Sequence, residues 1–320
     1  MKLIIQIPCY NEESILPQTF ADLPRYIDGI DEIEYLIIND GSTDNTVNVA
    51  RELGIHHIVS FKNNKGLARG FTAGLDACLR LGADVIVNTD ADNQYNGVDI
   101  AKLVAPIIDE KADMVIGERP INDIDHFSSR KKKLQHFGSW VVRVASGTNV
   151  PDAPSGFRAY SREAALRINV INSYTYTLET VIQAGAHRMA IASVPIRTNP
   201  ETRKSRLFKS MWAYIKRSST VIVRSFMMYR PLKFFSVLGT IMALIGLVFI
   251  IRFVILTAMG FGSGHVQSIV LAAMLIMIGV QCIIAGLQAD LTAANRKILE
   301  DIQYRVRKIE LTVKDDTKDE

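Results

Sequence analysis

Two aspartates, Asp90 and Asp92, stand one residue apart directly after an apolar run in the stretch VIVNTDADNQY (85–95). Because residues i and i+2 of an extended chain point to the same side, both carboxylates can aim at one point beyond the strand. Hard oxygen ligands of this kind suit Mg²⁺ or Mn²⁺, and Gln94 can supply a further oxygen. An acidic surface turn is the plainer alternative, but we favour a divalent metal site at Asp90, Asp92 and Gln94.

Two further loops place carboxylates after apolar runs. Glu12 follows the run KLIIQIP within IPCYNEE, and Asp40 follows EYLIIN within IINDGSTDNT. Such carboxylates can accept hydrogen bonds from a base N–H or a ribose hydroxyl. The chain contains neither a G-x-G-x-x-G dinucleotide fingerprint nor a P-loop, so no phosphate cradle of those types is expected. A plain strand-to-helix turn would explain Asp40 alone, but the two loops together indicate a nucleoside pocket.

Short apolar runs alternate with segments of helical period through the first 230 residues. The expected strands are 2–8, 34–39, 56–61, 84–89 and 113–117, and the expected helices are about 12–26, 44–53, 67–81 and 98–110. This alternation predicts an α/β fold with a mostly parallel sheet covered on both faces. The carboxyl ends of parallel strands meet at one edge, where ligands bind. The polar loops, including Glu118 and Arg119 after the fifth run, therefore predict a single site.

Two charge-free stretches, 234–251 and 266–289, follow the predicted sheet, and the first stays apolar beyond Arg252 as far as Met259. Each can cross a hydrocarbon core of ~30 Å. Buried helices of a soluble core are the alternative, but core helices of this length usually keep a polar stripe. Lys and Arg precede the first stretch and follow the second, whereas the link between them has none. We expect two membrane spans, about 234–258 and 266–289, with the catalytic domain and both termini on the cytoplasmic side.

The segments beside these spans carry a strong charge pattern. Between Arg197 and Lys233 the sequence has ten Lys or Arg residues and a single acidic residue, Glu201. This excess of positive charge favours contact with anionic lipid and an interfacial helix over 206–229. After Ala289, apolar residues at four- and three-residue steps predict a helix that either self-associates or lies on the catalytic domain. Three scattered cysteines fit a reducing compartment. We expect a catalytic domain at residues 1–200 and a basic juxtamembrane segment at 201–232. The transmembrane region would follow at 233–289, and a cytoplasmic helix and tail at 290–320.

Five motifs occur in the order IPCYNEE, INDGSTDNT, NNKGLARGFTAGL, TDADNQY and DAPSGFRAY. In this order they resemble the family 2 glycosyltransferases, which have the GT-A fold. The two spans and the basic loop NPETRKSRLF are similar to those of the polyprenyl-phosphate glycosyltransferases, the dolichol-phosphate mannose synthase type. The resemblance covers about residues 2–290. It implies inverting transfer from a nucleoside-diphosphate sugar to polyprenyl phosphate, for cell-surface glycan or protein glycosylation. The residues leave the base open between uridine and guanosine, and we favour a UDP-sugar over a GDP-sugar because UDP-sugars are the commoner donors in this family.

The resemblance also implies roles for individual residues. It assigns the nucleotide to Pro8, Tyr10, Glu12, Asp40 and Asp90, and a Mg²⁺ or Mn²⁺ ion to Asp90, Asp92 and Gln94. It implies catalytic roles for Asp92, Asp152 and Arg119. The cations and hydroxyl expected to bind the acceptor phosphate are Arg119, Arg203, Ser205 and Arg206, because guanidinium offers bidentate geometry. Surface arginines facing lipid are the alternative for these cations.

Two further residues of the resemblance keep two readings each, and a third has one. Asp152 either positions the acceptor or is a loop acid before Pro154. Glu179 either contacts the sugar or is a carboxylate on a helix surface. Arg158 is expected to be structural, pairing with an acid under the sugar.

Three other functions compete with this reading. A processive polysaccharide synthase would show a Q-x-x-R-W motif and more spans, but neither Trp140 nor Trp212 follows an arginine. A glycosyltransferase acting on another membrane lipid is disfavoured by the loop NPETRKSRLF. A non-catalytic membrane-anchored scaffold that binds nucleotide sugars would be favoured by degraded metal residues, but Asp90 and Asp92 are intact. The expected partners are a nucleoside-diphosphate sugar, polyprenyl phosphate and membrane lipids, without nucleic acid, and a homo-oligomer is left open.

Overall fold

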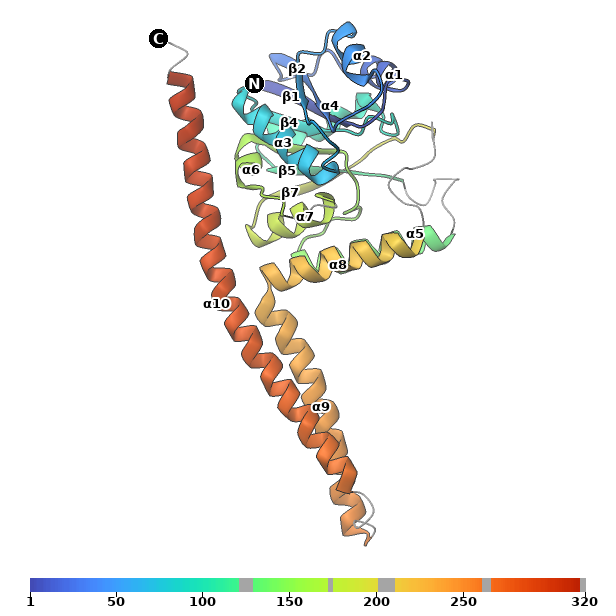
Figure 1. Cartoon of the computed structure of the whole chain (residues 1–320), viewed down its shortest axis with the longest axis vertical. Helices are drawn as coiled ribbons and strands as arrows, with labels where there is room; N and C mark the ends of the chain where they lie inside the picture. The colour runs from blue at the N-terminus through green and yellow to red at the C-terminus, as the bar shows by residue number, and fades with distance from the viewer. Residues whose placement is uncertain (121–128, 172–174, 201–210, 261–265, 317–320) are drawn as a thin grey trace. The chain divides into compact units, whose positions relative to one another are not determined.

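The computed structural model describes residues 1–120, 129–171, 175–200, 211–260 and 266–316. The chain divides into two compact units. The first comprises Met1–Ile222 and Gln303–Glu320, and the second comprises Val223–Ile302. The sheet lies in the first unit, and the two long apolar helices supply most of the second (Figure 1).

A seven-stranded sheet forms the centre of the first unit, in the order β3-β2-β1-β4-β6-β5-β7. The strands are β1 (Lys2–Cys9), β2 (Glu32–Asn39), β3 (His57–Ser60), β4 (Val85–Asn88), β5 (Met114–Glu118), β6 (Arg158–Ser161) and β7 (Ile191–Pro195). β6 pairs antiparallel with β4 and β5, and the other pairings are parallel. The predicted mostly parallel α/β sheet is therefore confirmed. The sequence pattern does not predict β6 and β7, because these four- and five-residue strands lack a long apolar run.

The helices of the first unit connect the strands. They are α1 (Leu16–Ala21), α2 (Thr46–Glu52), α3 (Leu67–Arg80), α4 (Ile100–Ile108) with the preceding 3-10 turn Gly97–Asp99, α5 (Ser129–Ser146), α6 (Arg162–Arg167) and α7 (Thr177–Ala186). Of the four predicted helices, the first is wrong in length, since α1 covers only six residues. It ends before Pro24, which cannot continue a helix.

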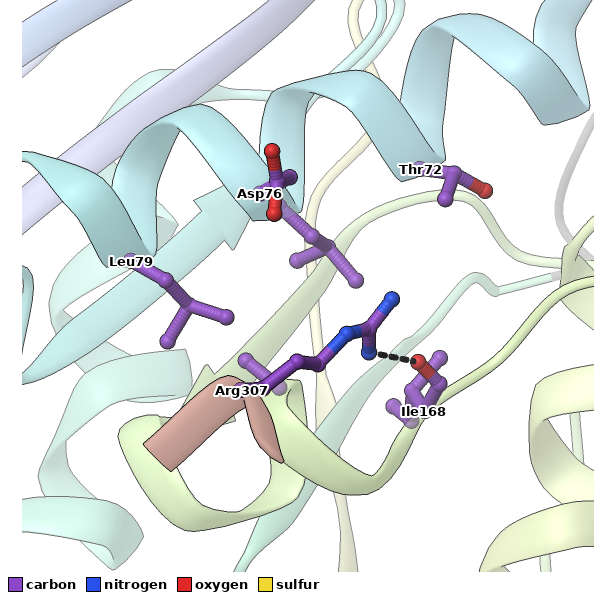
Figure 2. A pocket seen from close by; sticks show the side chains of 7 residues that line it. Thr72, Asp76, Leu79, Ile168 and Arg307 are labelled. Carbon is purple, nitrogen blue, oxygen red and sulfur yellow. Dashed lines mark hydrogen bonds between the residues drawn. The ribbon is translucent and has the colours of Figure 1, made fainter. Parts of the chain in front are cut away.

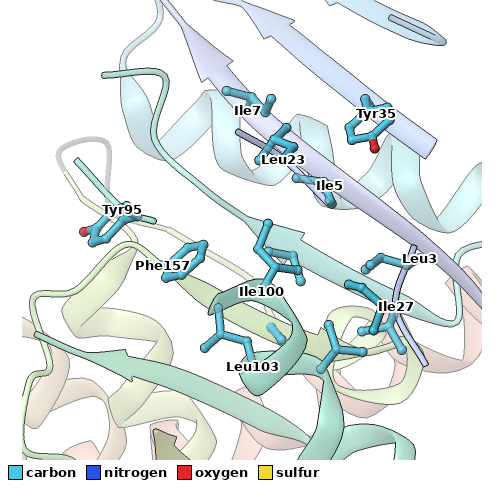
Figure 3. Packing of buried hydrophobic residues seen from close by; sticks show 14 of the residues in the cluster. Leu3, Ile5, Ile7, Leu23, Ile27, Tyr35, Tyr95, Ile100, Leu103 and Phe157 are labelled. Carbon is cyan, nitrogen blue, oxygen red and sulfur yellow. The ribbon is translucent and has the colours of Figure 1, made fainter. Parts of the chain in front are cut away.

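Both faces of β1 are buried, as its continuous apolar run predicts for a central parallel strand. The odd-numbered residues of β1 belong to one buried cluster that also contains Ile100 and Leu103 of α4 (Figure 3). The same cluster extends to Tyr95 and Phe157 beside the site. On the opposite face, a Cβ at Gly74 of α3 would collide with the side chain of Gln6. The glycine therefore allows α3 to pack directly on β1. The layers on both faces hold the strand ends in place.

The second unit contains α9 (Pro231–Ala258) and most of α10 (Val266–Asp316), preceded by α8 (Met211–Tyr229). The most apolar 18-residue windows of α9 and α10 have mean hydropathies of 2.7 and 2.5, enough to cross a membrane. Only 6% and 17% of these windows are buried, which is unlike the core helices of a soluble protein. A Cβ at Gly279 would stand 2.6 Å from the carbonyl oxygen of Gly239, so small residues let the two helices pack closely.

The helix expected after Ala289 is a continuation of α10, because no glycine or proline interrupts the chain between Leu287 and Asp316. Its last part, from Gln303, belongs to the first unit. There the Arg307 guanidinium donates to the carbonyl oxygens of Leu166 and Ile168, both at 3.2 Å. Figure 2 shows Arg307 in the small cavity between this segment and α3. Docking on the catalytic domain, one of the two readings from sequence, therefore holds for this part.

Asp99 gives the first unit a pH-dependent contact. It is fully buried, accepts from the Arg197 backbone N–H at 2.6 Å, and pairs with the Lys102 ammonium at 2.9 Å. Burial alone would raise its pKa, but the hydrogen bonds from Arg197 and Lys102 outweigh burial and lower the pKa of Asp99 from 3.8 to about 2. Because the folded pKa is the lower one, the stabilisation is fully present above about pH 4 and is lost as the pH falls towards 2.

We therefore expect Asp99→Asn to lower the free energy of unfolding by about 1–3 kcal/mol at neutral pH. The variant should also lose less stability than the parent protein between about pH 5 and pH 2.5, because the parent loses the contribution of the Asp99 carboxylate as it becomes protonated over this range. Thermal unfolding in detergent across this range measures both effects. The control is Asp109→Asn, because Asp109 is exposed and pairs with Lys111 at the surface. Equal acid sensitivity of Asp99→Asn and the control would contradict the prediction.

Candidate active site

The predicted site residues meet at one edge of the sheet. The carboxyl ends of β1, β2, β4 and β5 lie there, since these strands run in the same direction. β6 runs the opposite way, so its amino end lies at the same edge. The loop before β6, residues 152–157, therefore enters the site beside the loops that follow the other strands. This antiparallel strand is the reason that Asp152 and Arg119 can meet.

The loops after β1 and β2 are joined by side-chain to backbone hydrogen bonds. Asn11, in the left-handed region with φ of 56°, accepts from the Thr43 N–H at 2.8 Å, and its own N–H donates to the Ser42 hydroxyl at 3.0 Å. The Glu12 N–H donates to the Thr46 hydroxyl at 2.9 Å. These bonds bring together the two loops that the sequence assigns to a nucleoside. Of the residues assigned to the nucleotide, Glu12 is buried, Pro8 is partly buried and Tyr10 is exposed.

Asp40 lies buried at the end of β2 and organises the loop before α3. Its carboxylate accepts from the backbone N–H groups of Lys65 (2.6 Å) and Gly66 (2.9 Å). Gly66 has a φ of 88°, a conformation that glycine adopts without a steric penalty. Each carboxylate oxygen has a second lone pair, so Asp40 can hold this loop and still accept from a ligand. The sequence did not indicate these backbone partners.

Asp90 and Asp92 follow β4, which ends at Asn88, and Asp92 lies in a turn rather than in the extended backbone expected from sequence. The two carboxylates are nevertheless close enough for the charge of Asp92 to act on Asp90. Burial and the Asp92 carboxylate raise the pKa of Asp90, whereas Arg119 opposes this rise. Within the described residues, no group of three or more His, Cys, Asp and Glu side chains could hold a metal by itself. Two carboxylates with an amide nonetheless fit Mg²⁺ or Mn²⁺, which complete their coordination with water and substrate phosphates. The electrostatic conflict at Asp90 is of the kind that a bound cation relieves.

The turn that carries these aspartates is braced from two sides. Asn93, with φ of 55°, donates its side-chain amide to Asp22 at 2.8 Å. Asn199 donates its side-chain amide to the Asn93 carbonyl at 3.0 Å and its backbone N–H to the Gln94 carbonyl at 2.9 Å. Sequence reasoning missed Asn199, although it stands at the start of the quoted loop NPETRKSRLF. It links the acidic turn to the segment that leads into the basic loop.

Arg119 and Asp152, predicted in separate roles, form one ion pair. The Arg119 guanidinium donates to both Asp152 oxygens, from Nε at 2.7 Å and from Nη2 at 2.8 Å. The Arg119 backbone N–H also donates to Asp152 at 3.2 Å. The side chain of Asp152 is only 1% exposed and that of Arg119 15%, so the pair is largely shielded from water. The positive charge of Arg119 also lowers the pKa of Asp90, so the cation acts on the acidic turn.

One expectation from the resemblance, for Arg158, and one alternative to it, for Glu179, need correction. Arg158 does not pair with an acid among its observed hydrogen-bond partners; its guanidinium donates to backbone carbonyls of the preceding loop and to the Thr180 hydroxyl. Glu179 is not a carboxylate on a helix surface, because it is 2% exposed and accepts from the Ile171 N–H at 3.1 Å. The predicted acceptor-phosphate residues Arg203, Ser205 and Arg206 lie outside the described residues.

Comparisons with known proteins identify the family of the chain. The model of the family "Glycosyl transferase family 2" matches residues 4–168, just over half of the chain. A UDP-N-acetylglucosamine–dolichyl-phosphate N-acetylglucosaminyltransferase of Methanococcus voltae is 31% identical over 214 residues, which cover 60% of this chain and 83% of that protein. A polyprenol monophosphomannose synthase of Mycolicibacterium smegmatis is 27% identical over 206 residues, covering 61% and 76% of the two chains.

A solved structure shares the fold. Glucosyl-3-phosphoglycerate synthase from Mycobacterium tuberculosis, crystallised with Mn²⁺, UDP-glucose and phosphoglyceric acid, superposes with a TM-score of 0.55 at 20% identity. The alignment covers 71% of this chain and 78% of that one. At this identity the likeness concerns the fold, and it confirms the GT-A fold expected from the sequence. With the family match over the sheet and its loops, the chain belongs to glycosyl transferase family 2.

Proposed function

We propose that this protein is an inverting membrane glycosyltransferase that moves a sugar from a UDP-sugar to polyprenyl phosphate. The observation that carries the proposal is the placement of the Arg119–Asp152 pair beside Asp90 and Asp92 at one sheet edge. In this proposal, a site for a diphosphate would adjoin a cation for a second phosphate. The relatives named for dolichyl phosphate and polyprenol monophosphate support a lipid phosphate as the acceptor.

On the donor side, Pro8, Tyr10, Glu12 and Asp40 would bind the nucleoside in the joined loops after β1 and β2. Asp90, Asp92 and Gln94 fit a Mg²⁺ or Mn²⁺ ion, which when bound would neutralise the charge of the departing diphosphate. The braced turn would hold both carboxylates in place, so that little reorganisation is needed during the reaction. Asp90 would therefore serve both the metal and the nucleotide.

On the acceptor side, the phosphate monoester has a second pKa of about 6 and is largely dianionic at neutral pH. One of its oxygens would form the new bond to the anomeric carbon from the face opposite the diphosphate, which inverts that centre. The bond to the diphosphate breaks, and its electron pair leaves with the nucleotide. No proton has to be removed from the dianion, so a strong general base is not needed. Arg119 would attract the acceptor phosphate, and Asp152 would keep the guanidinium oriented.

The apolar helices α9 and α10 would place this chemistry at a membrane. In this proposal they span the bilayer, with the catalytic domain (1–200), the basic segment (201–232) and the residues after 289 on the cytoplasmic side. Arg203, Ser205 and Arg206 of the basic segment would assist Arg119 in binding the acceptor phosphate. A polyprenol remains in the bilayer, so only its phosphate has to reach the sheet edge. The product would serve cell-surface glycan or protein glycosylation.

The test is a donor panel with purified protein in detergent. Radiolabelled UDP- and GDP-sugars are each incubated with undecaprenyl or dolichyl phosphate, with Mn²⁺, with Mg²⁺ or with a chelator. We expect label in the organic phase from at least one UDP-sugar, dependent on the metal and on the phosphate of the polyprenol. Free polyprenol is the matched control acceptor. No label with any donor would contradict the transferase proposal, whereas label only from a GDP-sugar would overturn the choice of nucleotide alone.

A further inference from the structure

Arg158, the first residue of β6, is a fully buried cation with neutral partners. Its side chain is 0% exposed. Its guanidinium donates to the carbonyl oxygens of Ala153 (2.6 Å) and Ser155 (2.7 Å) and to the Thr180 hydroxyl (2.7 Å). Removing a guanidinium from water carries a penalty of several kcal/mol, which good hydrogen-bond geometry must offset. Two of these three bonds fix the loop that precedes β6.

The loop held by Arg158 touches both halves of the site. At its start, Asp152 binds Arg119 through two hydrogen bonds from the guanidinium. Near its end, a Cβ at Gly156 would stand 3.2 Å from an Asp90 carboxylate oxygen and 3.0 Å from the Tyr176 hydroxyl. A glycine lets the loop pass this close to Asp90 without a shift of the Asp90 or Tyr176 side chain. The conformation of residues 152–156 therefore affects the ion pair and the acidic turn together.

Gly156 is held by further contacts that do not use the Arg158 guanidinium as a donor. The two sets meet at Tyr176, whose ring centre lies 5.9 Å from the Arg158 guanidinium carbon and whose carbonyl accepts from the Thr180 hydroxyl at 2.9 Å. The Asn88 side-chain amide donates to the Gly156 carbonyl at 3.0 Å and to the Tyr176 hydroxyl at 2.8 Å. The Gly156 N–H donates to the Tyr95 hydroxyl at 3.1 Å. These contacts come from β4, from the segment after it and from the residue before α7. They anchor the end of the loop beneath Asp90, whereas Arg158 holds the carbonyls nearer to Asp152.

We propose that Arg158 is a positioning residue for the acceptor side of the reaction. Its guanidinium sets the backbone of Ala153–Ser155, so that Asp152 is presented to Arg119 and Arg119 faces the acceptor phosphate. This role rests on the proposed function. The planar fork of arginine can reach both carbonyls and the hydroxyl in fixed directions, whereas the single ammonium of lysine cannot reproduce that geometry. The donor side should depend less on Arg158, because the Asn88 side-chain amide and the Tyr95 hydroxyl hold Gly156 without using the Arg158 guanidinium.

The experiment compares Arg158→Lys with the matched control Arg162→Lys. Arg162 also donates to backbone carbonyls, those of Leu79 (3.3 Å) and Ala83 (3.1 Å), but these lie outside the loop. We expect Arg158→Lys to lower kcat/KM for polyprenyl phosphate about 10²-fold, as small misplacements in active sites do. Its Kd for UDP with Mn²⁺ should change less than about threefold, and the control should stay within about twofold of the parent in both measurements.

A second variant, Thr180→Val, removes one partner of Arg158 and leaves the two loop carbonyls in reach. We expect it to lower kcat/KM for polyprenyl phosphate in the same direction by about tenfold, again with UDP binding retained. Unchanged acceptor kinetics in both Arg158→Lys and Thr180→Val would overturn the role. Equal losses of UDP binding and transfer would also overturn it, because they indicate a general structural role. Absence of transfer by the parent and the control as well would overturn the proposed function, and this role with it.

Discussion

Replacing Asp92 by alanine is expected to lower metal-dependent sugar transfer about 10³-fold, the scale of losing a main electrostatic stabiliser of a transition state. Asp92 lies beside Asp90 after β4, and its Oδ1 accepts from the Gln94 N–H at 3.2 Å. Without it, one carboxylate and one amide remain of the proposed metal ligands. The diphosphate would then leave without an adequately held counter-charge. Transfer to polyprenyl phosphate with Mn²⁺ or Mg²⁺ measures the loss.

The same substitution should leave the metal-free protein at least as stable as the parent. Asp92 is partly exposed, and its charge repels that of Asp90, so its removal relieves a repulsion in the folded state. Thermal unfolding in detergent without metal should therefore show an equal or higher Tm. Addition of Mn²⁺ should raise the Tm of the parent but not that of Asp92→Ala. Retained metal-dependent transfer would show that Asp92 is not a metal ligand, and the exposed Asp109→Ala serves as the control.

Replacing Arg119 by alanine is expected to lower kcat/KM for polyprenyl phosphate about 10²- to 10³-fold. It should also destabilise the protein by about 3–5 kcal/mol, because the Asp152 carboxylate is then left buried without its guanidinium. Arg119→Lys keeps the charge but loses the two-point contact with Asp152, so we expect an intermediate loss of transfer. Steady-state kinetics with varied polyprenyl phosphate and thermal unfolding measure the two effects.

A double variant separates folding from chemistry at this pair. Arg119→Met combined with Asp152→Leu removes both charges, so neither is left buried and unpaired. We expect most of the stability lost in Arg119→Ala to return, on the pattern of buried ion pairs replaced by apolar residues. Transfer should stay low, because the acceptor phosphate still lacks its cation. High transfer by the double variant would show that Arg119 acts through stability alone.

Several features of the fold and site follow from short stretches of sequence. The five predicted strands are present because each is an apolar run bounded by turn residues, a pattern that depends on neighbours in the chain. The proximity of Asp90 and Asp92 follows from their spacing in the same way. The two apolar stretches are likewise helical, although the structure joins the second to the residues after it in one helix, α10.

The remaining features depend on contacts that no local pattern encodes. Strand β6 (RAYS) has no apolar run by which it could be recognised, yet its insertion between β4 and β5 brings the loop 152–157 to the site edge. Asp152 and Arg119 are 33 residues apart in the sequence, so they form an ion pair only after folding brings them together. The carbonyl partners of Arg158 were equally unpredictable, because any residue can offer a backbone oxygen.

The sequence by itself thus determined the family, the acidic pair and the apolar helices, since motif order, spacing and hydrophobicity are local properties. Tertiary structure alone decided which groups hold those residues in place. Asp40 binds the amides of Lys65 and Gly66, and Asn199 binds the turn that carries Asp92. Hydrogen bonds of this kind join backbone groups that are chemically the same at every position. Their partners are selected by strand order and packing, which emerge only when the whole sheet has formed.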